Sequence, residues 1–506
     1  MSDKTGADTI RQLARAVNEH FPDALLRKLH IKTPVEGEII FNAQKKNVVI
    51  VTGNPGDGKT HVIRRAEPEF PKKTNVVRDA NEIEGDELVR LIQGAVSDRT
   101  PLVMAINEGI LLQALHPVEG RYAWAKNLVG SLLHPYRYGD DDHRNHPEKT
   151  GAVVLDLTHR NNLAGEVVEA VLDKVTALAL SETTPMSENA RRLQDSTVKE
   201  RLCRLLDRVA RTGFHATMRD LLGFIAHLLC GGEDEIGDVP PRPYYVNAFV
   251  DGEGPLFDAV RRLDPVRVPS PFLDDRLFED EDALDEWLVD APEESPCGRN
   301  LVNFTTRKRR AFFEHKKGLE LLRNGHNDVQ DILQQLRDAG ESPERVAVGL
   351  LNRFFDSSSR VSDMLTLWVA HRYHARPVRY LAANVEISAG EFEVRVPRLP
   401  KHLESAFPQH YGDHVVFAHR DMETGEGLVM DERLVGQLLD GDRTSGLGVR
   451  DPEAYAKVSS FYDRLSRGSR SGPSSTVRIL RSDTMQQVQV GVNAEKRSYF
   501  IPGGIA

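Results

Sequence analysis

Hydrophobic and polar positions follow two patterns in the first third of the chain. Short apolar runs, which are typical of buried strands, occur at 48–52, 75–79, 101–109 and 152–157. Apolar residues at helical spacing occur at 9–29, 60–66 and 86–96. Strands that alternate with helices in this way predict a parallel sheet with helices on both faces. Ligand chemistry is then expected at the carboxyl ends of the strands.

Helical spacing dominates the next part of the chain, and strand patterns return toward the C-terminus. The predicted helices are Leu163–Leu180, Ser187–Val209 and Met218–Cys230, with a further helical stretch that extends to about Tyr373. The predicted strands beyond it are 384–388 and 391–396, which flank a turn at Ala389-Gly390, and a closing meander at 477–480, 488–492 and 498–501. We therefore expect an α/β fold with a helical lid, followed by a mixed α+β region.

Changes in composition predict four segments. Residues 1–185 hold an N-terminal helix and the α/β core, and residues 186–235 hold the helical lid. A Gly/Pro-rich stretch that begins at Gly231 leads into a Pro-rich, acidic linker at 236–300. Residues 301–506 form a mixed α+β domain that we expect to bind partners.

The overall composition narrows the class of protein. The chain has 506 residues, of which 40% are hydrophobic and 28% charged, as in proteins that form large cores. Its formal net charge of −10 argues against indiscriminate coating of nucleic acid. The three cysteines form no C-x-x-C pair, which is typical of the reducing cytoplasm and excludes a zinc ribbon. We see no signal peptide and no apolar run that would span a membrane.

The strongest candidate site directly follows the first apolar run. The motif G-x-x-x-x-G-K-[ST] is matched without departure by Gly53, Asn54, Pro55, Gly56, Asp57, Gly58, Lys59 and Thr60, with His61 next in the chain. Glycines allow successive backbone N–H groups to point at phosphate oxygens, and a helix that opens near the lysine adds its positive end. The lysine would neutralise phosphate charge, and the threonine hydroxyl would bind Mg²⁺. Residues 53–61 therefore predict a P-loop site for ATP and Mg²⁺.

The third apolar run ends at Asn107-Glu108, which is a candidate Walker B site. A Walker B strand ends in Asp-Glu, where the aspartate holds Mg²⁺ and the glutamate polarises the attacking water. Asn107 can still accept a hydrogen bond from metal-bound water, but it brings no charge, so we expect weaker metal binding. The alternative is that Asn107-Glu108 caps the next helix, for which asparagine is well suited.

The fourth apolar run brings Asp156 and Arg160 to the same edge of the sheet. If the strand order is that of AAA+ ATPases, the polar sensor 1 residue lies here, and Arg160 would reach the phosphate of a neighbouring subunit. Alternatively, Asp156 is itself the Walker B acid and a ligand of Mg²⁺. The sequence leaves both interpretations open.

The predicted lid carries a second arginine of interest. Arg219 lies in the first turn of the helix that begins after Thr217, a good N-cap residue. In AAA+ proteins a sensor 2 arginine stands in this kind of context and touches the γ-phosphate; the alternative is a surface arginine. A helical bundle after a P-loop sheet favours an AAA+-like protein over a GTPase or a kinase-like fold.

Four further patterns favour structural explanations. The polar stretch from Asp140 to His146 reads as a solvated loop rather than a metal site. The basic run at 306–317, which includes two phenylalanines, reads as an amphipathic helix, with base stacking and phosphate binding as the alternative. Histidines between 371 and 419 lack an acidic partner at ligand spacing. The segment E-F-E-V-R at 391–395 reads as an alternating strand, and we assign no nuclease.

The motifs taken together resemble a known family. T-P-V-E-G, V-T-G-N-P-G-D-G-K-T, V-R-D-A-N, A-I-N-E-G and F-T-T-R-K-R-R-A-F-F-E follow one another along much of the chain. This order resembles the ATPase component, the F-type protein, of DNA phosphorothioation-dependent restriction systems, although Glu108 departs from that family's pattern. The resemblance implies a bacterial anti-phage setting and partner proteins that read or cut DNA. Only the P-loop among these motifs is highly specific.

Three hypotheses follow for the function. The first is an AAA+-like ATPase that powers or licenses a multi-protein DNA-restriction complex, with other defence proteins as partners and DNA contacted directly or through them. Its catalytic residues would be Glu108, Asn107, Arg219 and Arg160, and its metal ligands Thr60, Asn107 and Asp156. The second is a nucleotide-gated scaffold with little turnover, which the asparagine at 107 favours. The third, a DNA translocase, is disfavoured by the acidic charge. Assembly into a homo-oligomer is a further expectation.

Overall fold

The protein is described by a computed structural model that divides the chain into two compact units. The first unit comprises residues 1–325 and 398–411, and the second comprises residues 326–397 and 412–506. The predicted boundaries at 235 and 300 both lie within the first unit. The structure describes residues 6–15, 23–136, 150–180, 185–230, 244–271, 273–274, 277, 296–322, 325–337, 343–347, 350–351, 364–371, 374–381, 392–410, 412, 414–419, 427–440, 457–458, 460–461, 475–481, 487–493 and 498–500.

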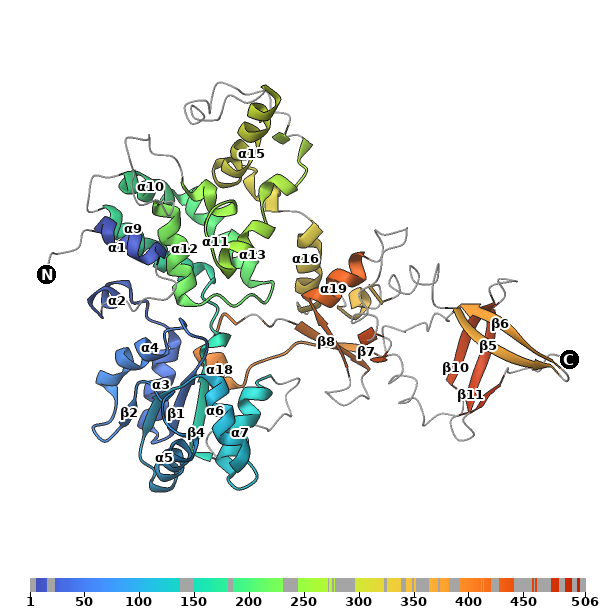
Figure 1. Ribbon diagram of the computed structural model, residues 1–506, viewed down its shortest axis with the longest axis horizontal. Coiled ribbons are helices and arrows are strands. Elements are labelled where there is room, and N and C mark those ends of the chain that lie inside the picture. Colours follow the sequence, from blue (N-terminus) through green and yellow to red (C-terminus); the bar gives the residue numbers. More distant parts are fainter. Residues whose placement is uncertain are drawn as a thin grey trace. The chain divides into compact units, whose positions relative to one another are not determined.

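A four-stranded parallel sheet lies in the first unit (Figure 1). Its strands, in the order β2-β3-β1-β4, are Asn75–Val77, Leu102–Ala105, Val48–Thr52 and Ala152–Asp156. All four runs were predicted as strands, and the predicted parallel α/β sheet is confirmed. Strand β1 lies between β3 and β4, so the chain that leaves β1 emerges between the carboxyl ends of two neighbours.

Helices cover both faces of this sheet because the side chains of β1 alternate between two cores. Val48 and Ile50 join one core, to which α5 (Gly85–Asp98), α6 (Glu108–Leu115) and α7 (Ala123–Leu133) contribute. Val49 and Val51 join the other, to which α3 (Pro34–Gln44), α4 (Lys59–Ala66) and α18 (Lys401–Ala406) contribute. Helix α18 comes from the C-terminal half of the chain.

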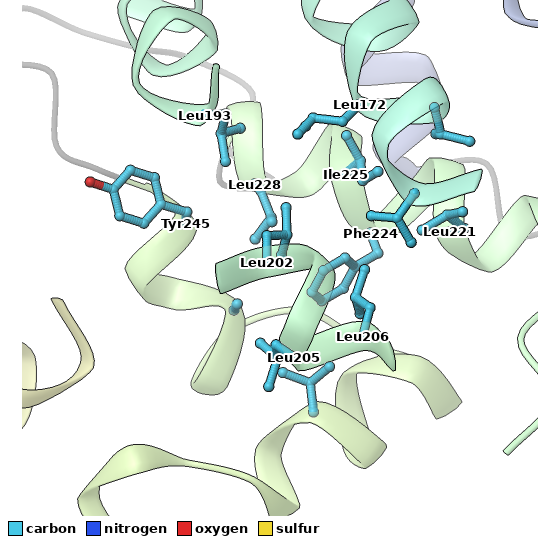
Figure 2. Close-up of a cluster of buried hydrophobic side chains, with 14 of the residues drawn as sticks. Leu172, Leu193, Leu202, Leu205, Leu206, Leu221, Phe224, Ile225, Leu228 and Tyr245 are labelled. Atoms are coloured by element: carbon cyan, nitrogen blue, oxygen red, sulfur yellow. The ribbon is translucent and has the colours of Figure 1, made fainter. Parts of the chain in front are cut away.

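Helices that are distant in sequence share one further core in the first unit. They include α1 (Gly6–Arg15), α9 (Gly165–Leu180), α10 (Pro185–Leu193), α11 (Ser196–Ala210), α12 (Met218–Cys230), α13 (Pro255–Arg262) and α15 (Pro296–Glu314). Figure 2 shows side chains from α9 to α12 gathered with Tyr245 in this cluster. The predicted helical bundle is confirmed, and it extends beyond the predicted lid at both ends.

Local capping explains how two helices of the bundle begin. The predicted helix Ser187–Val209 is two helices, α10 and α11, because the Asp195 carboxylate accepts hydrogen bonds from the backbone N–H groups of Thr197 and Val198 at 2.9 and 3.3 Å. Before α12, the Thr217 hydroxyl accepts from the Asp220 N–H at 3.1 Å, and the Asp220 carboxylate accepts from the Thr217 N–H at 2.9 Å. The predicted N-cap at Thr217 is therefore confirmed.

Residues 306–314 of the basic run lie on α15, and several of their side chains are buried in the bundle, whereas Lys316 and Lys317 beyond the helix are exposed. Phe312 and Phe313 are fully buried, as an amphipathic helix predicts. Lys308 is buried as well; its Nζ lies 2.6 Å from Asp274 and donates to the carbonyl of Val268 at 2.6 Å. Because both rings are buried, neither can stack on a nucleic-acid base. The prediction that these two phenylalanines belong to the core is therefore confirmed.

The second unit contains two antiparallel sheets. One has the order β7-β8-β9, with bounds Phe392–Arg395, His414–His419 and Leu428–Asp431, and packs with α16 (Gly325–Arg337) and α19 (Glu432–Asp440). The other has the order β12-β11-β10-β6-β5, with bounds Ser498–Phe500, Gln487–Asn493, Ser475–Arg481, His374–Leu381 and Met364–His371. The predicted meander near the C-terminus is confirmed as β10, β11 and β12.

Three predicted elements differ from the structure or lie outside it. The predicted helix at 9–29 corresponds to α1 and α2 (Asp23–Leu29), with residues 16–22 outside the described part. The helical stretch predicted to about Tyr373 is wrong at 364–371, where β5 pairs with β6; a continuous apolar run does not distinguish strand from helix by periodicity. Strand β7 pairs with β8, and the hairpin partner predicted at 384–388 lies outside the described residues.

Candidate functional site

The loop Gly53–Thr60 leaves β1 at the carboxyl edge of the parallel sheet. Its glycines at 53, 56 and 58 have φ values of 138°, 102° and 85°, a backbone region that side chains rarely adopt. A Cβ on Gly53 would lie 2.8 Å from a carboxylate oxygen of Asp57, and one on Gly56 would lie 3.1 Å from the Thr217 hydroxyl. The loop is therefore closed on itself and packed against the start of α12, so that a side chain at either position would be crowded and its backbone strained.

Hydrogen bonds to Asp57 hold the loop in its conformation. Its side chain is fully buried, and its carboxylate accepts a hydrogen bond from the Asn54 N–H at 2.6 Å. The other carboxylate oxygen lies 2.8 Å from Nε2 of His215, which donates because an ionised carboxylate can only accept. The carbonyl of Asp57 accepts from the Arg160 guanidinium at 2.6 Å. Asn54 of the loop and two other segments of the chain thus fix the position of Asp57.

Lys59 and Thr60 begin α4 directly after the loop. The Lys59 Nζ donates to the carbonyls of Gly53 and Asn54 at 2.8 and 3.1 Å, so the ammonium lies over the curl of the backbone. Burial lowers the pKa of Lys59, and the carboxylates of Asp57, Asp79 and Asp156 oppose that effect. The ammonium is therefore partly desolvated, which strengthens its attraction to any anion that enters the loop.

The ends of the two strands beside β1 carry the predicted acidic residues. Asn107 is the N-cap of α6, in extended backbone conformation, and Glu108 is the first residue of that helix. Asp156 ends β4, directly opposite Thr52 in the register with β1. Burial and the negative charge of Asp156 both raise the pKa of Glu108. Glu108 and Asp156 therefore interact electrostatically across the edge at which the loop emerges.

Two residues that the sequence interpretation missed link the loop to Asn107. The Thr60 hydroxyl donates to the carbonyl of Arg78 at 3.1 Å, which places Asp79 beside the start of α4. Asp79 accepts from the backbone of Asn81 at 3.0 Å, and the Asn81 side chain accepts from the Asn107 N–H at 2.8 Å. The rule that ligand chemistry lies at the carboxyl ends of strands applies to β2 as well, and it would have identified Asp79.

The two predicted arginines both lie at the loop. Arg160 is 9% exposed and donates a hydrogen bond to the loop of its own chain. Burial lowers the pKa of Arg160, and the charges of Asp57 and Glu36 oppose that effect. Arg219 lies in the first turn of α12, and its Cβ would be 3.4 Å from a Cβ on Gly56. The structure thus brings Arg160, Arg219, Asp156 and the loop together, although they are distant in sequence.

A second polar group borders the loop at His61. The Nε2 of His61 lies 3.1 Å from Nδ1 of His30, and Nε2 of His30 lies 3.5 Å from the Glu36 carboxylate. Burial, followed by the charge of His61, lowers the pKa of His30 to about 4. Burial also raises the pKa of Glu36. His30 is therefore neutral at pH 7 and becomes a destabilising charge only in acid.

The lowered pKa of His30 predicts an acid-sensitive first unit, and the raised pKa of Glu36 acts in the opposite direction. Because the pKa of folded His30 lies below the ordinary value of 6.5, the unfolded chain binds more protons between about pH 6.5 and pH 4. Protonation of His30 does not affect the free energy of unfolding above that window. The free energy of unfolding decreases as the pH falls through it, by up to about 3 kcal/mol at pH 4. Urea unfolding of the full chain at several pH values, compared between wild type and His30→Gln, measures the effect. The exposed His116→Gln is the matched control, and an unchanged pH dependence in His30→Gln would contradict the prediction.

The other predicted features add no second site within the described residues. No group of three or more His, Cys, Asp or Glu side chains is arranged to hold a metal by itself in the part of the chain that the structure describes. The stretch from Asp140 to His146 lies outside that part. None of the described helices is both long and apolar enough to cross a membrane.

Comparison with protein-family models, with curated proteins and with solved structures gave no match.

Proposed function

We propose that this chain binds ATP and Mg²⁺ at the Gly53–Thr60 loop and hydrolyses the nucleotide. The observation that carries this proposal is the loop itself, which is held in its curled form by Asp57 and covered by the Lys59 ammonium. Backbone N–H groups at the opening of a helix, together with a lysine, form the standard environment for phosphate oxygens. A polyphosphate would replace the two carbonyls that now accept from Lys59.

The surrounding oxygen ligands fit a magnesium ion. Mg²⁺ takes one or two carboxylates and completes its shell with phosphate oxygens and waters, so it needs no protein cage. The Thr60 hydroxyl, Asp79 and Asp156 lie around Lys59, and Asp79 and Asp156 both interact electrostatically with its ammonium. In this proposal Thr60 holds the ion directly, and Asp156 or Asp79 supplies the charge that Asn107 lacks.

Glu108 is the proposed general base for the attacking water. A base works best when its pKa approaches the operating pH, and burial and Asp156 move the pKa of Glu108 in that direction. Arg219, on the helical bundle beside Gly56, is placed to respond to the γ-phosphate. A bundle that reaches the loop in this way supports an AAA+-like P-loop ATPase.

Titration of the full chain with ATP tests the proposal. We expect one nucleotide per chain, with a Kd between about 1 μM and 1 mM, and tighter binding when Mg²⁺ is present. Thr60→Val should bind ATP nearly as well without Mg²⁺ but gain little from its addition. The exposed Thr100→Val is the matched control and should keep the full Mg²⁺ effect. Absence of ATP binding by the wild-type chain would overturn the proposal.

A nucleotide-gated scaffold is the second candidate, and Asn107 favours it. Asn107 occupies the N-cap position of α6, and its backbone N–H donates to the Asn81 side chain at 2.8 Å. Its neutral amide brings no charge to the metal. Such a protein would bind ATP tightly and use it to control partner assembly. Tight binding with negligible turnover, measured with Mg²⁺ and DNA present, would select this function over the ATPase.

The biological setting is proposed from the resemblance alone. An ATPase of this kind would power or license a multi-protein complex that restricts foreign DNA in the cytoplasm. Phage plating on cells that carry the wild-type or the Lys59→Ala chain tests this role. Equal plating would argue against a role of the nucleotide site in defence.

A further inference from the structure

A segment from the C-terminal half of the chain is built into the core beside the candidate site. Residues 398–411 belong to the first unit, although the residues on both sides of them belong to the second. Leu399, Leu403, Ala406 and Phe407 are each at most 5% exposed, in the same core as Val49 and Val51 of β1. The segment is therefore anchored by apolar burial in the core that also holds the strand leading to the loop.

This anchored segment is the connection of a β-hairpin. Strands β7 and β8 pair antiparallel, with Arg395 opposite Val416, and the chain between them passes through residues 398–411. Only a few residues separate each end of the anchored segment from the paired strands. The segment is therefore covalently continuous with the hairpin at both of its ends.

His410 connects the segment to the residues after β4. Its Nδ1 lies 3.0 Å from the carbonyl of His159, and its Nε2 lies 3.2 Å from the Tyr136 hydroxyl. Because a carbonyl only accepts, Nδ1 carries the proton and Nε2 accepts from the tyrosine. The rings of His410 and Tyr136 are stacked with centroids 5.8 Å apart. The position and tautomer of His410 are thus fixed by two partners.

The next residue along the chain continues this path to the loop. His159 precedes Arg160, whose guanidinium donates to the carbonyl of Asp57 at 2.6 Å. Asp57 in turn accepts from the Asn54 N–H within the loop. Two adjacent residues therefore contact the C-terminal segment on one side and the proposed phosphate site on the other.

We propose that segment 398–411 couples nucleotide occupancy of the loop to the β7–β8 hairpin, with His410 as the positioning residue. The proposal rests on the proposed nucleotide site. A bound nucleotide tightens the loop, which fixes Arg160 and the His159 carbonyl and so keeps His410 docked. By thermodynamic reciprocity, docking of the segment raises nucleotide affinity by the same factor by which nucleotide favours docking.

Hydrogen–deuterium exchange of the full chain, with and without ATP and Mg²⁺, tests this coupling. We expect the nucleotide to slow exchange in peptides that cover 398–411 and 414–419 by about 5- to 150-fold. His410→Phe keeps the ring stacking but removes both hydrogen bonds. This variant should lose most of the nucleotide-dependent protection and bind ATP more weakly by a similar factor. Glu404→Gln, at an exposed position of α18, should behave as wild type.

The outcomes distinguish the coupling from the nucleotide site itself. If the wild-type chain binds ATP but exchange in 398–411 and 414–419 does not change, the coupling is overturned and the site stands. If the wild-type chain binds no ATP, both proposals fail. An unfolding midpoint of His410→Phe equal to that of wild type shows that any loss of affinity is not a loss of folding. Equal ATP affinity in His410→Phe and wild type would also overturn the coupling.

Discussion

Lys59→Ala is expected to reduce ATP turnover by at least about 100-fold, the effect of removing one preorganised charged donor from a developing charge. The ammonium lies over the loop, within hydrogen-bond distance of two backbone carbonyls that a phosphate would displace. Burial makes its charge more effective and lowers its pKa, and the carboxylates of Asp57, Asp79 and Asp156 oppose that lowering. The steady-state rate of phosphate release by the full chain measures the effect.

Two further variants make the Lys59 experiment specific. Lys72→Ala removes an exposed lysine and should leave turnover unchanged. Lys59→Arg keeps the positive charge, but the planar guanidinium is larger than an ammonium and does not fit over the loop backbone in the same way. We therefore expect this variant to restore little activity. Unfolding midpoints of all three variants check that the chain still folds. Wild-type turnover in Lys59→Ala would mean that ATP hydrolysis takes place elsewhere.

Glu108→Gln is expected to lower turnover by about 100- to 10,000-fold while ATP binding is retained. Glutamine has the shape of glutamate but cannot take a proton from water. Because the residue does not contact the Gly53–Thr60 loop in the proposed role, affinity should change little. Comparison of ATP affinity with the single-turnover rate separates the two effects. Full turnover in Glu108→Gln would assign the base to another residue, with Asp156 the next candidate.

The pH–rate profile adds a sharper test of Glu108. A general base must be ionised, so the rate falls on the acid side as the pH drops below its pKa. The negative charge of Asp156 raises that pKa. Asp156→Asn removes the repulsion and should therefore move the acid limb of the profile to lower pH. If instead Asp156→Asn abolishes the Mg²⁺ dependence of binding and Asp79→Asn does not, Asp156 is the metal ligand.

The candidate site was only partly predictable from the sequence. The loop, Thr217 as an N-cap and Arg219 at the head of α12 all depend on a few neighbouring residues, so local patterns are sufficient to identify them. Asp79 was accessible to the same reasoning, because it ends the predicted strand 75–79 at the edge where ligands bind. The Walker B candidates that the sequence offered, Glu108 and Asp156, follow the third and fourth apolar runs and not the second.

The contacts that hold the loop could not have been predicted in this way. His215 and Asp57 are 158 residues apart, and neither belongs to a recognisable motif with the other. Arg160 is a charged residue whose interaction with its own chain requires burial between two segments, a condition that hydropathy does not encode. The same limitation explains β5, where an apolar run fits a strand or a helix until a partner strand is known.

The sequence by itself determined the parallel α/β sheet, the helical bundle and the position of the Gly53–Thr60 loop, because periodicity and turn chemistry are local properties. Only the tertiary structure decided which side chains surround the loop and where residues 398–411 belong. His410 meets Tyr136 across 274 positions of sequence. Such a contact depends on how separately formed elements pack to bury their apolar faces, and no local pattern contains that information.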